Sequence, residues 1–262
     1  MPMAADHNKV LCKIAVSKRR NGQIVKVIAL LLTSGGLVTS AGYGQGIQDQ
    51  TRSTANPGDR LDLAIAAIAE RLWDPDSSVR LTAVAALRDM GDKAKTAIPA
   101  LAERLRDTDQ YVAIDASHAL AKMGPEAVPS LVPLLWDIKP RVRELAVRTL
   151  GEIGPEAKAA IPAITERLRD CDPSVRQSAV GALREMGAKA KTAIPVLADL
   201  LRDRDQIIRI DASLVLVRMG RDAVPHVTGL LHDADARVRE LAIQTLQRIA
   251  AEELSVGHAD RR

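Results

Sequence analysis

The chain has 262 residues, a formal net charge of +4 and only 2% aromatic residues, with no phenylalanine. Packing must therefore rest on Leu, Ile, Val and Ala, which suits closely stacked helices and does not require a large globular core. Six of the 37 basic residues but only one of the 33 acidic residues precede Gly42, which leaves 31 bases, 32 acids and a net charge of −1. Because a nucleic-acid-binding domain needs a basic face, this balance disfavours nucleic acid as a partner.

Residues 1–41 have the pattern of a secretory signal peptide. A basic segment ending at Arg20 precedes an apolar run of 14 residues, Ile24–Leu37, and small residues end at Ala41. The run contains Lys26 and is too short for a comfortable transmembrane span. We therefore expect cleavage after Ala41, export to the periplasm or the extracellular space, and no stable membrane span afterwards. The alternatives are a cytoplasmic protein with an apolar N-terminus and an uncleaved membrane anchor.

Residues 42–60 are polar and rich in glycine, and no apolar residues recur at helical spacing there. Such composition is typical of a flexible linker. Residues 61–250 then contain one helical pattern written six times. Residues 251–262 follow as a polar C-terminal tail.

Each copy of the pattern predicts two antiparallel helices, most clearly in residues 161–187. Pro162 fits the first turn of a helix, and apolar residues follow it at helical spacing. Asp172 and Pro173 begin the second helix as N-cap and first residue, and Gly187 ends it as a C-cap. Neither helix can bury its apolar face alone, so the copies must stack.

The leucines that precede the turn between the two helices set the period. They are separated by 33, 30, 33, 33 and 30 residues. These leucines are Leu72, Leu105, Leu135, Leu168, Leu201 and Leu231. A shift of 96 residues superimposes the first three repeats on the last three, which indicates a duplicated three-repeat block. The sequence therefore predicts an all-α fold, an α-solenoid of about six stacked helix pairs.

The shared motif is L-x-D-x-D-x-x-V-R-x-x-A-x-x-A-L-x-x-[IM]-G, and it recurs in phase over about three quarters of the chain. It resembles HEAT repeats, specifically the short HEAT-like repeats of the phycobilisome-lyase type. The resemblance implies an α-solenoid and usually a binding or scaffold role. Some members are enzymes, namely bilin lyases and deoxyhypusine hydroxylase. The His-Glu iron ligands of the hydroxylase have no counterpart here, because the sequence contains no His-Glu dipeptide.

Residue patterns that would indicate catalysis or metal binding are missing from the sequence. The four histidines after residue 41 lack the spacing of zinc ligands. The Asp-x-Asp turns offer too few oxygen ligands for calcium, and their second aspartate stands where a helix N-cap belongs. We therefore expect no catalytic residues, no metal and no cofactor.

An arginine recurs one residue after the first apolar position of the second helix. The row consists of Arg80, Arg143, Arg176, Arg209 and Arg239, and Ala113 interrupts it in repeat two. Such a row could bind anions. We favour the structural interpretation, in which each arginine pairs with a turn aspartate of its own or the adjacent repeat.

The second helices also carry the predicted partner-binding surface. Positions two, six and nine residues after the first apolar residue point away from the core at about 100° per residue. In HEAT-like arrays this ridge commonly lines the concave surface. Repeat five holds three aliphatic residues at these positions although other repeats hold charged ones, so packing does not require them. An exposed apolar patch usually marks an interaction site.

The predicted partner-binding residues are Leu81, Ile114, His118, Arg148, Arg184, Ile210, Leu214 and Val217. The alternative is that an extra helix, the tail or a second copy of the chain covers this ridge. Trp73 and Trp136 follow the turn-preceding leucine, where other copies have Arg or His. Each ring either covers the first helix of the next repeat or anchors a partner.

These patterns favour an exported, non-enzymatic HEAT-repeat scaffold or adaptor that binds a protein partner on the concave face of its second helices. Self-association into a homo-oligomer stays open. The alternative is a lyase-like or other enzyme subunit of the phycobilisome-lyase HEAT class, acting on a tetrapyrrole or a protein. Such an enzyme would need a cavity with convergent polar groups, whereas a scaffold would show an open face.

Overall fold

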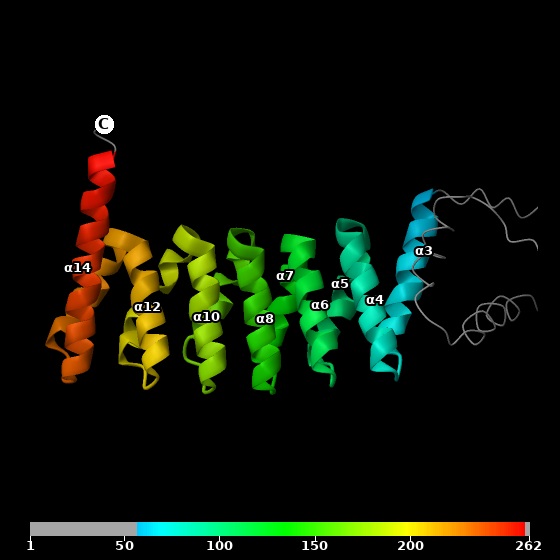
Figure 1. Cartoon of the computed structure of the whole chain (residues 1–262), viewed down its shortest axis with the longest axis horizontal. Coiled ribbons are helices and arrows are strands. Elements are labelled where there is room, and N and C mark those ends of the chain that lie inside the picture. The colour runs from blue at the N-terminus through cyan, green and yellow to red at the C-terminus, as the bar shows by residue number, and fades with distance from the viewer. Residues whose placement is uncertain (1–56, 260–262) are drawn as a thin grey trace, which may run out of the picture. The chain divides into compact units, whose positions relative to one another are not determined.

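A computed structural model of the chain describes residues 57–259, and within this range the predicted all-α solenoid is confirmed. Six helix pairs follow one another in a row, and no β-strand occurs among these residues. The second helices of the pairs lie side by side in one layer, with the first helices behind them (Figure 1). The predicted signal peptide 1–41 and most of the predicted linker 42–60 lie outside the described residues.

The second helices owe their start to the Asp-x-Asp turns. They are α4 (Ser77–Met90), α6 (Gln110–Met123), α8 (Pro140–Ile153), α10 (Pro173–Met186), α12 (Gln206–Met219) and α14 (Ala236–Ala259). In α10, the N-cap Asp172 accepts a hydrogen bond from the Ser174 amide at 2.9 Å. Lys139 caps α8 without a side-chain bond, and Pro140 follows it in the first turn. The predicted capping role of the second aspartate is confirmed.

The first helices are α3 (Pro57–Glu70), α5 (Ile98–Glu103), α7 (Val128–Leu131), α9 (Ile161–Arg167), α11 (Ile194–Asp199) and α13 (Val224–Thr228). Apart from α3, which has 14 residues, the first helices are shorter than the second helices, because 3₁₀ turns flank them. The chain passes from each second helix to the next repeat at a glycine, such as Gly154 with φ of 74°. A positive φ is costly for a residue with a Cβ atom, so glycine ends these helices.

Both ends of the array extend beyond the predicted limits. α3 begins at Pro57, four residues before the predicted start at residue 61. α14 continues to Ala259, so most of the predicted polar tail is helical. At the position where the other second helices are followed by glycine, α14 has Ala250, which favours continuation of the helix.

One apolar cluster runs through all six repeats and contains no aromatic side chain. Its largest fully buried members include Leu72, Leu105, Leu135 and Leu168, four of the leucines that set the period. Since aliphatic side chains alone fill it, the close stacking expected from the composition is confirmed.

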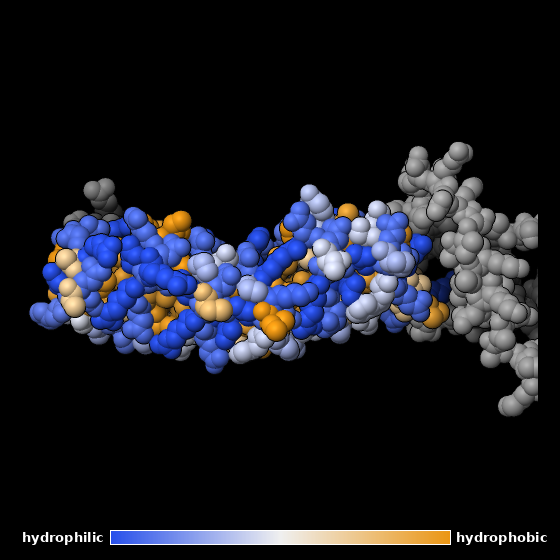
Figure 2. All heavy atoms as spheres, turned by 90° about the horizontal axis from the view of Figure 1, so that it is seen from below, coloured by the Kyte–Doolittle hydropathy of each residue, from blue (hydrophilic) through white to orange (hydrophobic). Residues whose placement is uncertain are grey.

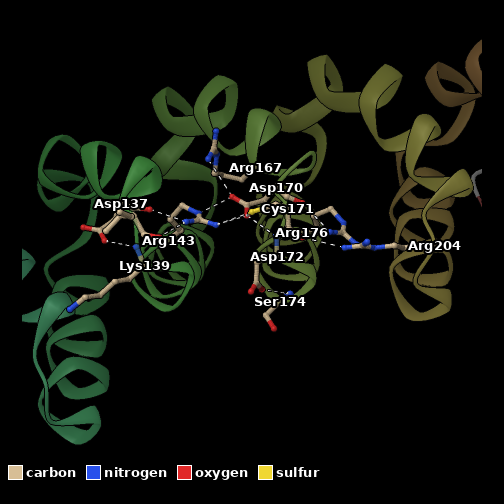
Figure 3. Close-up of polar contacts among 11 residues, drawn as sticks. Asp137, Lys139, Arg143, Arg167, Asp170, Cys171, Asp172, Ser174, Arg176 and Arg204 are labelled. Carbon is tan, nitrogen blue, oxygen red and sulfur yellow. Dashed lines mark hydrogen bonds and ion pairs between the residues drawn. The ribbon is translucent and has the colours of Figure 1, made fainter.

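A buried arginine joins repeats three and four. Arg143 donates from Nε and Nη2 to the two carboxylate oxygens of Asp170, at 2.8 and 2.6 Å (Figure 3). Its Nη1 donates to the carbonyl oxygens of Asp137 and Ile138 in its own turn. The side chains of Arg143 and Asp170 are only 9% and 2% exposed. One guanidinium therefore fixes its own turn and the turn of the next repeat together.

At every repeat boundary, an arginine forms an ion pair with the first aspartate of the next turn. The predicted pairing is confirmed for the pairs Arg80–Asp107, Arg143–Asp170 and Arg176–Asp203. At the other two boundaries the arginine is the residue after the turn leucine, in the pairs Arg106–Asp137 and Arg202–Asp233. Arg209 and Arg239 donate to carbonyl oxygens of their own turns instead.

The boundaries are therefore of two kinds, which differ in the link between repeats. In the long-link interfaces, between repeats one and two, three and four, and four and five, seven residues form the 3₁₀ link. In the short-link interfaces, between repeats two and three and repeats five and six, the link has four residues.

The packing at the two kinds of interface also differs. The short-link interfaces bury hydroxyl pairs, Ser117–Thr149 at 3.0 Å and Ser213–Thr245 at 2.8 Å. The long-link interfaces have apolar residues at these positions, for example Val147 in place of Ser117. The length of the link, the arginine that pairs across the boundary and the pair of side chains buried there therefore change together.

The arginine–aspartate pairs make the stability of the array depend on pH. Burial acts to raise the pKa of Asp107 and of Asp170. The hydrogen bonds from Arg80 and Arg143, those from the backbone amides of Asp109 and Asp172, and the positive charge of the nearby arginines together outweigh burial and hold both pKa values below the usual range. The folded array therefore binds fewer protons than the unfolded chain at acidic pH. The stabilisation is fully present above the unfolded pKa near 4 and is lost as pH falls through the lower folded values.

We predict that the free energy of unfolding, measured by urea titration, falls as pH decreases below about 4. The double variant Asp107→Asn, Asp170→Asn should be less stable at neutral pH and should show a shallower fall. An equally steep fall in the variant would contradict the assignment of this pH dependence to the two carboxylates.

Candidate functional site

The exposed side of the second-helix layer is the candidate site, and we call it the B face. On each second helix, the outward positions are one residue before and two, six and ten residues after the first apolar residue that faces the core, which is Val112 in α6. These positions fall within about 80° of one another around a helix, so they form one stripe along its outer side.

The outward stripe of α12 is apolar. Ile207 is 57% exposed and Ile210 is 43% exposed, and Leu214 next to them is half-buried. Their spacing of three and four residues places them on one helix face. At the same positions α14 has Arg237, Glu240 and Gln244, so the repeat does not need apolar residues there.

A similar stripe lies on α6, the helix equivalent to α12 in the first three-repeat block. Tyr111 is 64% exposed, Ile114 is half-buried and His118 is exposed. α8 and α10 separate the two stripes (Figure 1). These two helices carry the exposed residues Arg148 and Arg184, as expected. The Nε atom of Arg184 lies 3.2 Å from a carboxylate oxygen of Glu185.

The prediction for Val217 is wrong, because this side chain is only 2% exposed and belongs to the core. In repeats three and five, the position nine residues after the first apolar residue faces the next repeat rather than solvent, whereas the long side chain of Arg184 at the same position of repeat four reaches solvent. Gly151 shows this in repeat three, because a Cβ atom there would lie 2.8 Å from the Cα atom of Ala182. A neighbouring helix therefore buries a position that a single helical wheel places outside.

Leu81 and Ile114 also differ from the prediction in part. Both are half-buried and pack against the core, so they contribute to folding as well as to the surface. Tyr111 and Ile207 were missed, because they immediately follow the first residue of their helices and were left outside the predicted ridge. The same count of about 100° per residue, extended one residue backwards, would have found them.

Trp73 and Trp136 are 57% and 49% exposed, and each lies against an arginine of the next repeat. The guanidinium of Arg104 lies 3.8 Å from the ring centre of Trp73, and that of Arg167 lies 5.4 Å from Trp136. Both distances are within the range of cation–π contacts. The rings therefore cover part of the following repeat, and their exposed halves remain available.

The edge that carries the turns is mostly hydrophilic, with apolar side chains in separate groups (Figure 2). An open depression of about 370 Å³ lies there between repeats one and two, beside Trp73. The arginines that line it are engaged in ion pairs, Arg80 and Arg104 with Asp107 and Arg106 with Glu103. Its polar groups are therefore occupied with one another.

Among residues 57–259, no helix is both long enough and apolar enough to cross a membrane. No three His, Cys, Asp or Glu side chains in the same range are grouped as metal ligands would be.

Comparison with solved structures finds engineered proteins and a lyase complex among the matches. An engineered protein is 23% identical, with a TM-score of 0.45, over 72% of this chain and 97% of its own. A second engineered protein is 22% identical, with a TM-score of 0.44, over 76% of this chain and 66% of its own. The complex of CpcE and CpcF of phycocyanin lyase from Nostoc sp. PCC7120 is 25% identical, with a TM-score of 0.46, over 57% and 98%.

No curated protein matches the chain. The family model for HEAT repeats matches residues 65–139, 98–184, 128–217 and 161–247, which together cover more than half of the chain. The matched segments overlap and together run from α3 to α14, and the resemblance predicted from the turn motif is confirmed. The chain belongs to the HEAT repeat family.

Proposed function

We propose that the protein is a non-enzymatic scaffold or adaptor that binds a protein partner on the B face. The exposed apolar stripe of α12, made of Ile207, Ile210 and Leu214, is the observation that carries this proposal. Exposed apolar patches on soluble proteins commonly mark interaction sites. Polar residues at the same positions of α14 show that folding of the repeat does not explain the stripe.

The layout of the face indicates what kind of partner it would fit. Neighbouring helices pack roughly 8–10 Å apart, so the stripes of α6 and α12, three helices apart, are separated by roughly 30 Å. A partner that touches both would need an extended surface, such as a helix of about 20 residues. Arg148 and Arg184 lie on the helices between the stripes and would favour acidic groups at the centre of that partner.

The alternative, a lyase-like enzyme subunit, would need convergent polar groups in a cavity. The open depression beside Trp73 is a poor candidate, because its arginines are held in ion pairs that join repeats one to three. The open B face supports the scaffold over this alternative.

The double variant Ile210→Glu, Leu214→Gln tests the proposal. Both residues lie outside the apolar core, so we expect the free energy of unfolding to change by no more than about 1 kcal/mol. Capture of the partner by immobilised protein, from extracts of the cells that produce it, should be lost.

The matched control is Ile138→Glu, Leu63→Gln, which changes two residues of the same types that are 91% and 68% exposed and lie off the B face. It should capture the partner as the wild type does. Equal capture by the test variant, or equal loss by the control, would contradict a site at α12.

We also propose that the protein is exported, on the basis of the signal pattern in residues 1–41. Intact-mass analysis of the protein recovered from producing cells should show a chain that begins near Gly42. Recovery of the full-length chain from the cytoplasm would contradict export and would leave the proposed B-face interaction unaffected.

A further inference from the structure

The first and last repeats each have one side that no other described repeat covers. On the last repeat, Ile243 of α14 is 42% exposed. Ile243 lies twelve residues after the turn leucine of its repeat. In the first five repeats the residue at that position faces the next repeat and is buried. Those buried residues are Val84, Ser117, Val147, Val180 and Ser213. Ile243 therefore occupies a packing position without a neighbour.

The two uncovered sides carry complementary halves of the ion pair that joins the repeats. Asp74, the first turn aspartate of repeat one, accepts the amide of Asp76, and no arginine in residues 57–259 donates to its carboxylate. The corresponding aspartates of the other five repeats each accept from an arginine of the preceding repeat.

Among residues 57–259, Arg239 in repeat six lacks the other half of this pair, a carboxylate of a following repeat. Its Nη1 donates to the carbonyl oxygens of Asp233 and Ala234 in its own turn, as Arg143 does in repeat three. Its Nε and Nη2, the atoms through which Arg143 holds Asp170, have no partner within the described chain. The guanidinium of Arg239 in repeat six and the carboxylate of Asp74 in repeat one are therefore unpaired with each other's kind in the part of the chain that the structure describes, and they lie at opposite ends of the array.

The chain also contains a template for joining these ends. The 96-residue duplication relates repeat three to repeat six and repeat four to repeat one. It places Arg239 where Arg143 stands and Asp74 where Asp170 stands. It likewise places Ile243 at the position of Val147 and Ala86 at the position of Ala182. The two uncovered sides are therefore copies of two sides that pack together between repeats three and four.

The residues at the ends match a long-link interface rather than a short-link one. Repeat six has Arg239, a member of the recurring row of arginines on the second helices. Its residue after the turn leucine is His232 rather than an arginine like Arg106. It has Ile243 where the short-link interfaces have serine, and repeat one has Ala86 where they have threonine. Both ends therefore belong to one kind of interface.

One position departs from the template, because Gln247 stands where Gly151 packs closely on Ala182. The other two long-link interfaces have Arg88 and Arg184 at this position. Long side chains are therefore accommodated in this kind of interface. α14 continues along its own axis beyond the last repeat and does not fold back across this side (Figure 1).

We propose that copies of this chain stack head to tail, with repeat six of one copy packed on repeat one of the next. Arg239 donates from Nε and Nη2 to Asp74 of the neighbouring copy, and Ile243 packs beside Ala86 of that copy. The contact joins two different surfaces, so a third copy can add to either free end. The B face takes no part in the contact, and the proposal does not depend on the proposed function.

Charge reversal at each end tests the proposal by complementation. The wild-type chain, as it accumulates in cells, should show an average mass in analytical ultracentrifugation that rises with concentration. Arg239→Asp alone and Asp74→Arg alone place like charges at the contact, and each should weaken association about 30-fold or more. An equimolar mixture of the two variants restores opposite charges at every contact and should recover association.

Two controls separate the contact from general effects of charge and exposure. Arg218→Asp reverses an exposed charge on α12, and Ile138→Asp changes an exposed isoleucine in a turn; both should associate like the wild type. Ile243→Asp should weaken association while leaving helicity unchanged. A wild-type chain that remains monomeric at every concentration overturns the proposal. It is also overturned if the reversals have no effect, or if their mixture does not recover.

Discussion

An arginine that reaches across each repeat boundary to the first aspartate of the next turn is the contact on which the array depends. Taking both charges out of water is costly, and only good geometry offsets that cost. In the Arg143–Asp170 pair, both carboxylate oxygens and all three guanidinium nitrogens have partners. The pair therefore fixes the position of one repeat relative to the next, which aliphatic packing alone specifies weakly.

The repeat boundaries show how the length of the link decides which arginine pairs with the aspartate of the next repeat. Where the link has seven residues, the arginine on the second helix reaches the next turn. Where the link has four residues, Arg106 or Arg202 takes over, and a hydroxyl pair replaces two apolar side chains. The same turn motif thus serves two interface geometries, and the array remains continuous through both.

Much of this could be predicted from the sequence, because the caps, turns and leucines depend on local spacing. The pairing of Arg80, Arg143 and Arg176 with a turn aspartate was predicted from their recurrence at one position of the second helix. The roles of Arg106 and Arg202 did not, because they depend on how the shorter link shifts one repeat against another. Burial of Val217 was missed for the same reason, since a helical wheel contains no neighbouring helix. The outward stripe on α12 was found except for Ile207, which lies in the first turn of its helix.

A double-mutant cycle on Arg143 and Asp170 tests the dependence of the array on these pairs most directly. The free energies of unfolding of the wild type, Arg143→Ala, Asp170→Ala and the double variant would be measured by urea titration. We predict a favourable coupling energy of at least about 1.5 kcal/mol, because both side chains are buried and bonded to each other. Effects that add to within about 0.5 kcal/mol would show that packing alone holds the repeats in register.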